Sequence, residues 1–141
     1  MKHLLFFIVC LCFHMDILAQ NKVTVRIENI KNNKGVCQTC IFSSAASFEK
    51  MEPLQCFKGS IQNKNSIVVF PDVPDGTYAV FVFHDVNNNN IMDKNFLGIP
   101  REGYGASLNK LPFAAAPKFS ENSFVLENNR LLNLTIRLRN M

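Results

Sequence analysis

The run Tyr78–Phe83 (YAVFVF) constrains the fold more than any other stretch of the chain, because it carries no charged or amide side chain. A β-strand turns successive side chains to opposite faces, so an unbroken apolar run predicts a strand that is covered on both faces. Such a strand lies inside a sheet. Residues 84–107, which follow it, are rich in Asn, Asp, Gly and Pro. The sequence therefore predicts a central strand followed by a long loop.

Further strands are predicted by alternation of apolar and polar residues and by β-branched residues. The clearest lies at 132–139, where Leu132, Leu134, Ile136 and Leu138 alternate with polar side chains. Others are expected at 23–27, 36–42, 55–61, 66–70 and 124–126, with a short helical turn within 43–51. About seven short strands and no long helix predict a single all-β, antiparallel sandwich.

Two turns are marked by their residues. Pro74-Asp75-Gly76 predicts a tight turn, since Pro fixes its own φ and Gly accepts a positive one. We expect this turn to join 66–70 to 78–84 as a hairpin. Asn128-Asn129 marks a second turn before the last strand.

Side chains that carry oxygen recur at every second position after the central strand. They are Asp85, Asn87 and Asn89, and Asp93 follows with a second carboxylate. Together with the backbone carbonyl of Ile91, this spacing predicts a calcium-binding loop, because Ca²⁺ prefers about six to eight oxygen ligands.

Two departures from the usual calcium loop predict a weak site. Asn90 stands where such loops have Gly, although Asn tolerates left-handed backbone best after Gly. Phe96 stands at the twelfth position, which is normally a bidentate Glu, while Glu102 lies farther on and would have to fold back. The alternative is a metal-free loop, locked by Asn and Asp side chains that bond their own backbone.

The start of the chain predicts export. Residues 1–19 form a signal peptide, with Lys2 and His3 before an apolar run and Ala19 at the cleavage point; a retained anchor is the alternative. Residues 20–141 then form the β-sandwich domain, in the periplasm, on the outer surface or secreted. The net charge of +4 is scattered, so we expect no nucleic-acid partner. We also expect no membrane span after cleavage, and a monomer.

Three cysteines follow the signal segment: Cys37, Cys40 and Cys56. Alternation in the strand 36–42 puts Cys37 and Cys40 on opposite faces, so they should not pair with each other. In an oxidising compartment one disulfide is expected. We predict Cys40–Cys56, with Cys37 buried and free, and Cys37–Cys56 is the alternative.

Residues 76–107, GTYAVFVFHDVNNNNIMDKNFLGIPREGYGAS, resemble a family of exported bacterial proteins of unknown function. Its members share a pattern close to PxGxYAxxxxHDxNxNGxxDxNxxGxPxEGYGxS. The matching positions include His84, Asp85, Asp93, Asn95, Gly98, Pro100, Glu102, Gly103, Tyr104, Gly105 and Ser107. Departures fall at Asn90, Ala106 and Leu108. The resemblance covers nearly all of the chain after residue 22. It implies a prealbumin-like or immunoglobulin-like sandwich and no activity.

Five residues complete the candidate site as ligand-binding or loop-structuring groups: His84, Arg101, Glu102, Tyr104 and Ser107. We expect the His84 ring to hold the long loop by hydrogen bonds. Tyr104 should pack across the loop, and Arg101 should be solvated. Arg101 and Glu102 are also candidates to pair with each other or to bind a ligand.

Three functions are compatible with these residues. The first is an exported, non-enzymatic binding or structural module with a weak calcium loop, whose ligand is a glycan or a peptide. The second is a small hydrolase that uses His84, Asp85 and Ser107, although Ser107 lacks a nucleophile elbow and we predict no catalytic residue. The third is a structural sandwich without metal.

Overall fold

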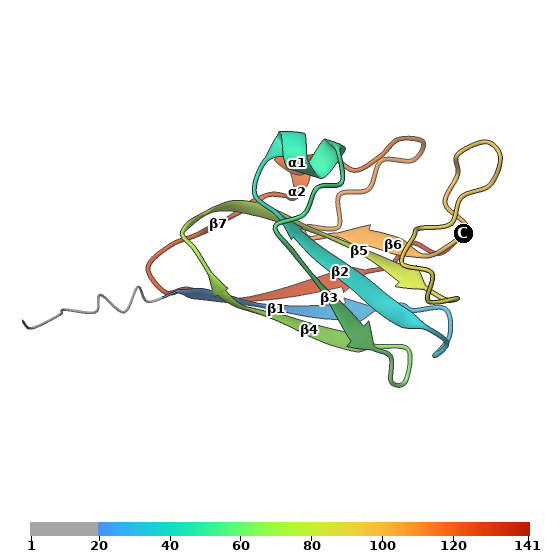
Figure 1. The fold of residues 1–141 in the computed structure, drawn as a ribbon, viewed down its shortest axis with the longest axis horizontal. Helices are drawn as coiled ribbons and strands as arrows, with labels where there is room; N and C mark the ends of the chain where they lie inside the picture. The colour runs from blue at the N-terminus through green and yellow to red at the C-terminus, as the bar shows by residue number, and fades with distance from the viewer. Residues whose placement is uncertain (1–19) are drawn as a thin grey trace, which may run out of the picture.

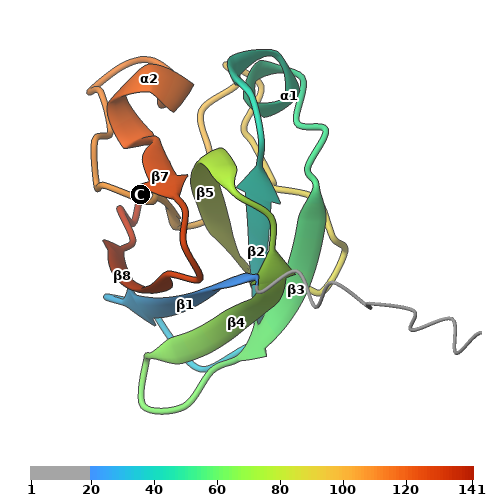
Figure 2. The ribbon, with the colours of Figure 1, turned by 90° about the vertical axis from the view of Figure 1, so that its left-hand side faces the viewer.

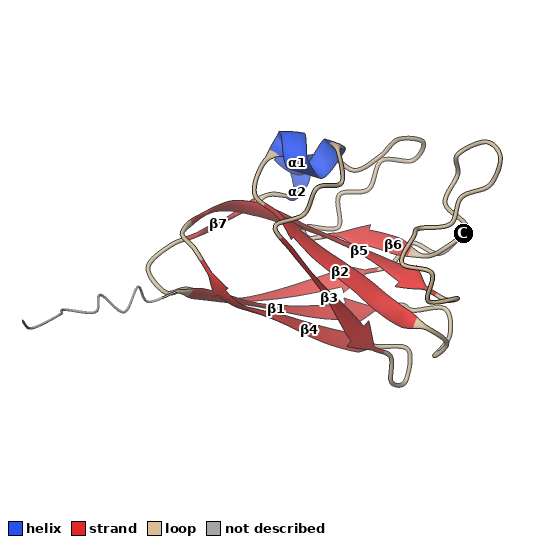
Figure 3. Ribbon diagram, viewed as in Figure 1, coloured by secondary structure: helices blue, strands red, loops and turns tan. Residues whose placement is uncertain are grey.

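The computed structural model describes residues 20–141, drawn in colour in Figure 1. The predicted signal segment, 1–19, lies outside the described residues. Strands dominate, with two short helices on one side of them (Figure 3). In chain order the elements are β1 (Asn21–Glu28), β2 (Val36–Phe42), α1 (Ala45–Glu49), β3 (Gln55–Ser60), β4 (Ser66–Val73), β5 (Gly76–Asp85), β6 (Tyr104–Ala106), α2 (Phe119–Asn122), β7 (Phe124–Leu126) and β8 (Leu131–Arg137).

The strands form two packed sheets, seen as two layers in Figure 2. One has the order β4-β1-β8, and the other has the order β3-β2-β5-β6, with β7 also paired to β5. Side chains from both sheets, such as Val25, Phe70, Val82 and Ile136, meet in the core between them. The predicted all-β sandwich is confirmed. Within residues 20–141, neither helix is long and apolar enough to cross a membrane.

The apolar run Tyr78–Phe83 lies in β5 and is buried on both faces, which confirms the prediction. Val80 and Val82 point into the core between the sheets, whereas Phe81 belongs to a second cluster on the outer face. Phe48 of α1 covers that outer cluster, with its ring centroid 6.4 Å from that of Phe81. Because β5 is held from both sides, its last residues give the long loop a rigid base.

The prediction of a hairpin at Pro74-Asp75-Gly76 is wrong. The chain does turn there, but β4 pairs with β1 while β5 pairs with β2 in the other sheet. Figure 1 shows the ribbon passing from one layer to the other between β4 and β5. A tight turn reverses the chain locally, and its residues carry no information about which sheet the next strand joins.

The pairing of β1 with β8 is parallel, in register from Lys22–Leu131 to Glu28–Arg137. The other strand pairs of the described residues are antiparallel. The prediction that all strands pair antiparallel is therefore wrong for β1 and β8. Alternation along β1 and β8 determines which face is buried, but it does not determine strand direction.

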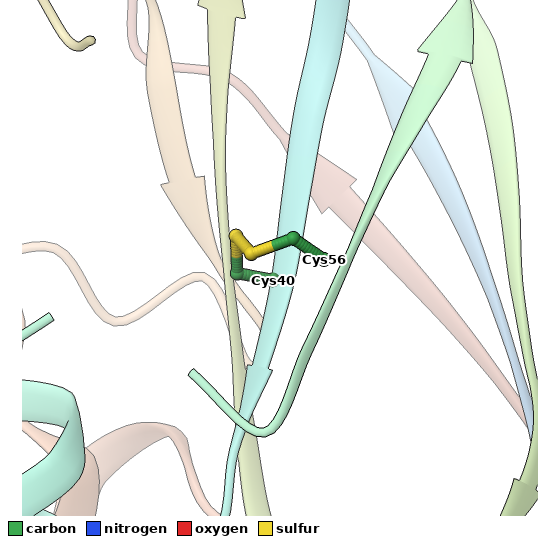
Figure 4. Close-up of a disulfide and its surroundings, with 2 residues drawn as sticks. All are labelled: Cys40 and Cys56. Carbon is green, nitrogen blue, oxygen red and sulfur yellow. A yellow bond between two sulfur atoms is a disulfide. The ribbon is translucent and has the colours of Figure 1, made fainter. Parts of the chain in front are cut away.

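Cys40 of β2 and Cys56 of β3 form the predicted disulfide (Figure 4). The two residues lie directly opposite each other in the β2–β3 register. Cys37 is free and buried on the other face of β2, as alternation predicted. Burial raises the pKa of the Cys37 thiol to about 12, while the nearby Ser66 hydroxyl acts in the opposite direction.

Candidate functional site

The long loop starts with a tight curl built on Asp85, the last residue of β5. The Asp85 carboxylate is buried and accepts the backbone N–H groups of Asn89, at 3.1 Å, and Asn90, at 2.8 Å. These two bonds fold the chain back over the end of the strand. Asn88 and Asn90 adopt left-handed backbone, with φ of 58° and 64°. Asn90 thus takes a conformation that Gly adopts more readily.

Asp93 closes the curl from its other side. The side-chain amides of Asn87 and Asn89 donate to the Asp93 carboxylate at 2.8 and 3.0 Å. Their amide oxygens accept backbone N–H groups, that of Asn89 at 3.2 Å and that of Ile91 at 3.0 Å. The structure thus brings Asp85, Asn87, Asn89 and Asp93 into one hydrogen-bonded cluster. The Ile91 side chain is 65% exposed.

Glu102 returns to this cluster from the far end of the loop. Its buried carboxylate accepts the N–H groups of Val86 and Asp93, both at 3.0 Å. Arg101 has an exposed side chain, and its backbone N–H donates to the Asp93 carbonyl at 2.8 Å. Glu102 and Arg101 form no ion pair with each other within residues 20–141. Glu102 therefore joins the two ends of the loop.

Within the described part of the chain, the loop carboxylates form no salt bridge. The one salt bridge within residues 20–141 joins Arg26 and Glu28 on β1. Asp85, Asp93 and Glu102 are connected instead through N–H groups of the loop. In this part of the chain, no group of three or more His, Cys, Asp or Glu side chains is arranged to hold a metal ion. A cation at the loop would therefore need amide oxygens as well as carboxylates.

Contrary to the expectation from the sequence, the His84 ring does not bond the long loop but a turn elsewhere in the chain. Its buried ring Nε2 lies 2.7 Å from the Lys34 carbonyl oxygen, in the turn between β1 and β2. Gly35 follows with φ of 69°, and a Cβ there would clash with the Asp85 carbonyl oxygen. Only the backbone N–H of His84 reaches the long loop, at the Gly103 carbonyl (2.8 Å). The ring thus fixes the β1–β2 turn against the base of the loop.

Ser107 is also committed to backbone bonds. Its buried hydroxyl accepts the Val80 N–H at 3.0 Å and donates to the Asn122 carbonyl. Val80 and His84 are four residues apart along β5, which separates them by roughly 13 Å. Because Asp85 bonds the loop and His84 bonds Lys34, the three side chains do not form the linked triad that a hydrolase needs.

Tyr104 packs on the outer face of the five-stranded sheet. It is 7% exposed, and its ring centroid lies 6.1 Å from that of Phe81. A Cβ at Gly105 would lie 2.5 Å from the Ile136 side chain. Tyr104 and Arg139 also exchange backbone hydrogen bonds of 3.1 and 2.8 Å. The glycine therefore permits close approach of β6 to the end of the chain.

A groove of about 370 Å³ lies between the long loop and the outer face of the five-stranded sheet. It is lined by Gln38, Cys40, Phe42, Met51, Pro53, Cys56, Phe83, Asn90, Ile91, Met92 and Lys94. The Gln38 Oε1 atom is buried and has no hydrogen-bond partner among the described residues. Sequence reasoning missed this groove, although alternation placed Gln38 on the same face as Cys40 and Phe42. Its other wall arises only when the loop folds back.

Comparison with known proteins gives one match. A family model described as an uncharacterized protein conserved in bacteria (DUF2141) matches residues 25–132, from β1 into β8. No curated protein matches, and no solved structure matches. The family match covers well over half of the chain. The chain therefore belongs to the bacterial family DUF2141.

Proposed function

We propose that the protein is an exported, non-enzymatic binding module whose long loop contacts the ligand and is held at residues 85–93 by calcium. The observation that supports calcium is the gathering of oxygen-bearing side chains from Asp85, Asn87, Asn89 and Asp93 in one hydrogen-bonded cluster. Two carboxylates and two side-chain amides offer the oxygen ligands that Ca²⁺ prefers.

Calcium suits the donors that the loop offers. Asp85 and Asp93 supply carboxylate oxygens, Asn87 and Asn89 supply amide oxygens, and Ile91 supplies a carbonyl. The amides of Asn87 and Asn89 now donate to Asp93, so they would rotate to turn oxygen toward a cation. Because two neutral amides take part and the usual Glu is missing, the affinity should be that of extracellular modules, on the order of 10⁻⁴–10⁻³ M.

The ligand site that we favour is the groove beside the loop. Met51 and Met92 line it, and methionine adapts to irregular apolar groups. Gln38 also lines the groove, and its buried, unpartnered Oε1 would accept a ligand donor once the amide rotates toward the groove. A peptide or a glycan supplies both an N–H or O–H donor and an apolar face. We place the protein in the periplasm or beyond, since the Cys40–Cys56 disulfide suits an oxidising compartment.

Thermal unfolding in calcium and in chelator tests the calcium step. Wild type should melt at a higher temperature in millimolar calcium, because a ligand of the folded state stabilises it by mass action. Asp93→Asn should remove this rise, since it deletes one of the two carboxylates. Asp72→Asn is the matched control, because Asp72 is an exposed acid on β4. Magnesium should substitute poorly, since it requires strict octahedral geometry.

A second candidate is favoured by the bonds that the loop already makes. The side chains of Asp85, Asn87, Asn89 and Asp93 all have partners within the loop. If calcium and chelator give wild type the same melting temperature, the calcium proposal fails and a metal-free structural sandwich takes its place. Asn89→Ala should then lower the melting temperature equally in both buffers.

A further inference from the structure

Two loop tips present large apolar side chains to solvent. The first lies at 96–99, where Phe96 is 95% exposed and Leu97 is 68% exposed. The second lies between β6 and α2, where Phe113 is 99% exposed. The folded chain otherwise buries most of its aromatic rings against the two sheets. Exposed aromatic rings at two protruding points indicate a surface that a partner covers.

The tip at 96–99 is held in shape by hydrogen bonds. The Asn95 side-chain oxygen accepts the N–H groups of Leu97, at 2.9 Å, and Ile99, at 3.0 Å. The backbone of Asn95 bonds Ile99 and Gly98 at 2.9 Å, and Gly98 has φ of 77°. Phe96 and Leu97 are therefore presented on a turn that is already ordered, so binding costs less conformational entropy.

The second tip is anchored at its base. The Arg139 guanidinium donates to the carbonyls of Leu111 and Pro112, both at 2.7 Å. Figures 1 and 2 show this loop and the long loop rising on the same side of the molecule, the side that carries α1. Two loops on one side of the fold can approach the same surface.

Basic side chains flank both tips. Lys94 and Arg101 border the first tip, and Lys110 and Lys118 border the second; all four are exposed. Between 94 and 118 the only acidic residue is Glu102, whose buried carboxylate is bonded inside the loop. Apolar tips with basic neighbours in the chain match an anionic membrane surface, where rings enter the headgroup region and cations meet lipid phosphates.

We propose that these two tips insert into the interface of an anionic lipid bilayer and hold the protein at a membrane surface. A protein partner would need a pocket for each projecting ring, whereas a fluid bilayer accepts a convex tip without one. The inference goes beyond the proposed function and rests on neither calcium nor the groove.

A tryptophan reporter tests insertion directly, because the chain contains no Trp. The purified exported protein carrying Phe96→Trp is mixed, in chelator, with vesicles of phosphatidylcholine, with or without phosphatidylglycerol. Tryptophan emission should shift to shorter wavelength only with phosphatidylglycerol, and brominated lipid should quench it. Ile67→Trp is the matched control, since Ile67 is 60% exposed on β4 of the other sheet. Its emission should not change.

Vesicle sedimentation gives the second measurement. The double variant Phe96→Ser/Phe113→Ser should lower partitioning into phosphatidylglycerol vesicles by at least about tenfold, as expected for removing two buried rings. Ile67→Ser should bind like wild type. The proposal is overturned if wild type does not sediment with these vesicles, or if the double variant binds as well as wild type. Unchanged tryptophan emission from vesicle-bound Phe96→Trp protein would also overturn it, since the contact would then be electrostatic only.

Discussion

Cys37 places its thiol in the dry core between the two sheets, where the pKa rises from 9.0 to about 12. Below about pH 9 the thiol is protonated in both the folded and the unfolded chain, so its contribution to stability is complete. Above that pH the unfolded chain ionises first, and this contribution is lost as the pH approaches 12. A free cysteine thus makes the fold sensitive to alkali.

The variant Cys37→Ala isolates this effect. Between about pH 9 and 10.5, the free energy of unfolding of wild type should fall by about 1.5 kcal/mol more than that of the variant. Urea unfolding, followed by circular dichroism at several pH values, measures both slopes. Parallel slopes would show that the thiol ionises as readily in the folded chain as in the unfolded one.

Single residues of the loop were foreseeable to different degrees. The alternate oxygens from Asp85 to Asn89 were visible in the sequence because Asx side chains bond backbone a few residues away. The return of Glu102 and the contact of the His84 ring with Lys34 were not visible. Both join segments whose separation depends on how the whole sandwich closes.

At the scale of elements, β8 tests the assignment of buried faces. Leu134 is 8% exposed and packs between the sheets, while Arg137 points outward. Leu134→Ala should lower the free energy of unfolding by about 2–4 kcal/mol, as buried large-to-small changes do. Arg137→Ala should cost less than about 0.5 kcal/mol. Urea melts compare the two, and equal effects would mean that the strand faces the other way.

Strands with strong patterns were predictable, and their connections were not. The predicted limits of β2 agree with the structure, and those of β3 differ by one residue. β6 escaped prediction because three residues that include Gly105 carry no periodicity. The direction of β8 escaped for another reason: a parallel and an antiparallel strand bury the same alternating side chains.

At the scale of the whole molecule, one side of the sandwich gathers the features with proposed roles. The long loop, the groove and both apolar tips belong to the side of the five-stranded sheet that carries α1 (Figure 1). The three-stranded sheet turns Arg26, Thr135 and Arg137 outward, together with Ile67 and Val69 of β4. A protein held through the tips would therefore present its groove toward the membrane and its three-stranded sheet toward water.

The parallel contact between β1 and β8 has a consequence for when the chain can fold. β1 needs a neighbour that begins at Leu131, more than a hundred residues later. Under the export that we propose, a chain leaving a translocation channel N-terminus first cannot complete its three-stranded sheet until the final segment emerges. We expect a chain ending at Asn129 to lack the cooperative unfolding of the complete chain, as circular dichroism would show. Native-like unfolding of that fragment would contradict this. Because the three-stranded sheet would be completed late, the polypeptide would stay unfolded enough to pass through the channel.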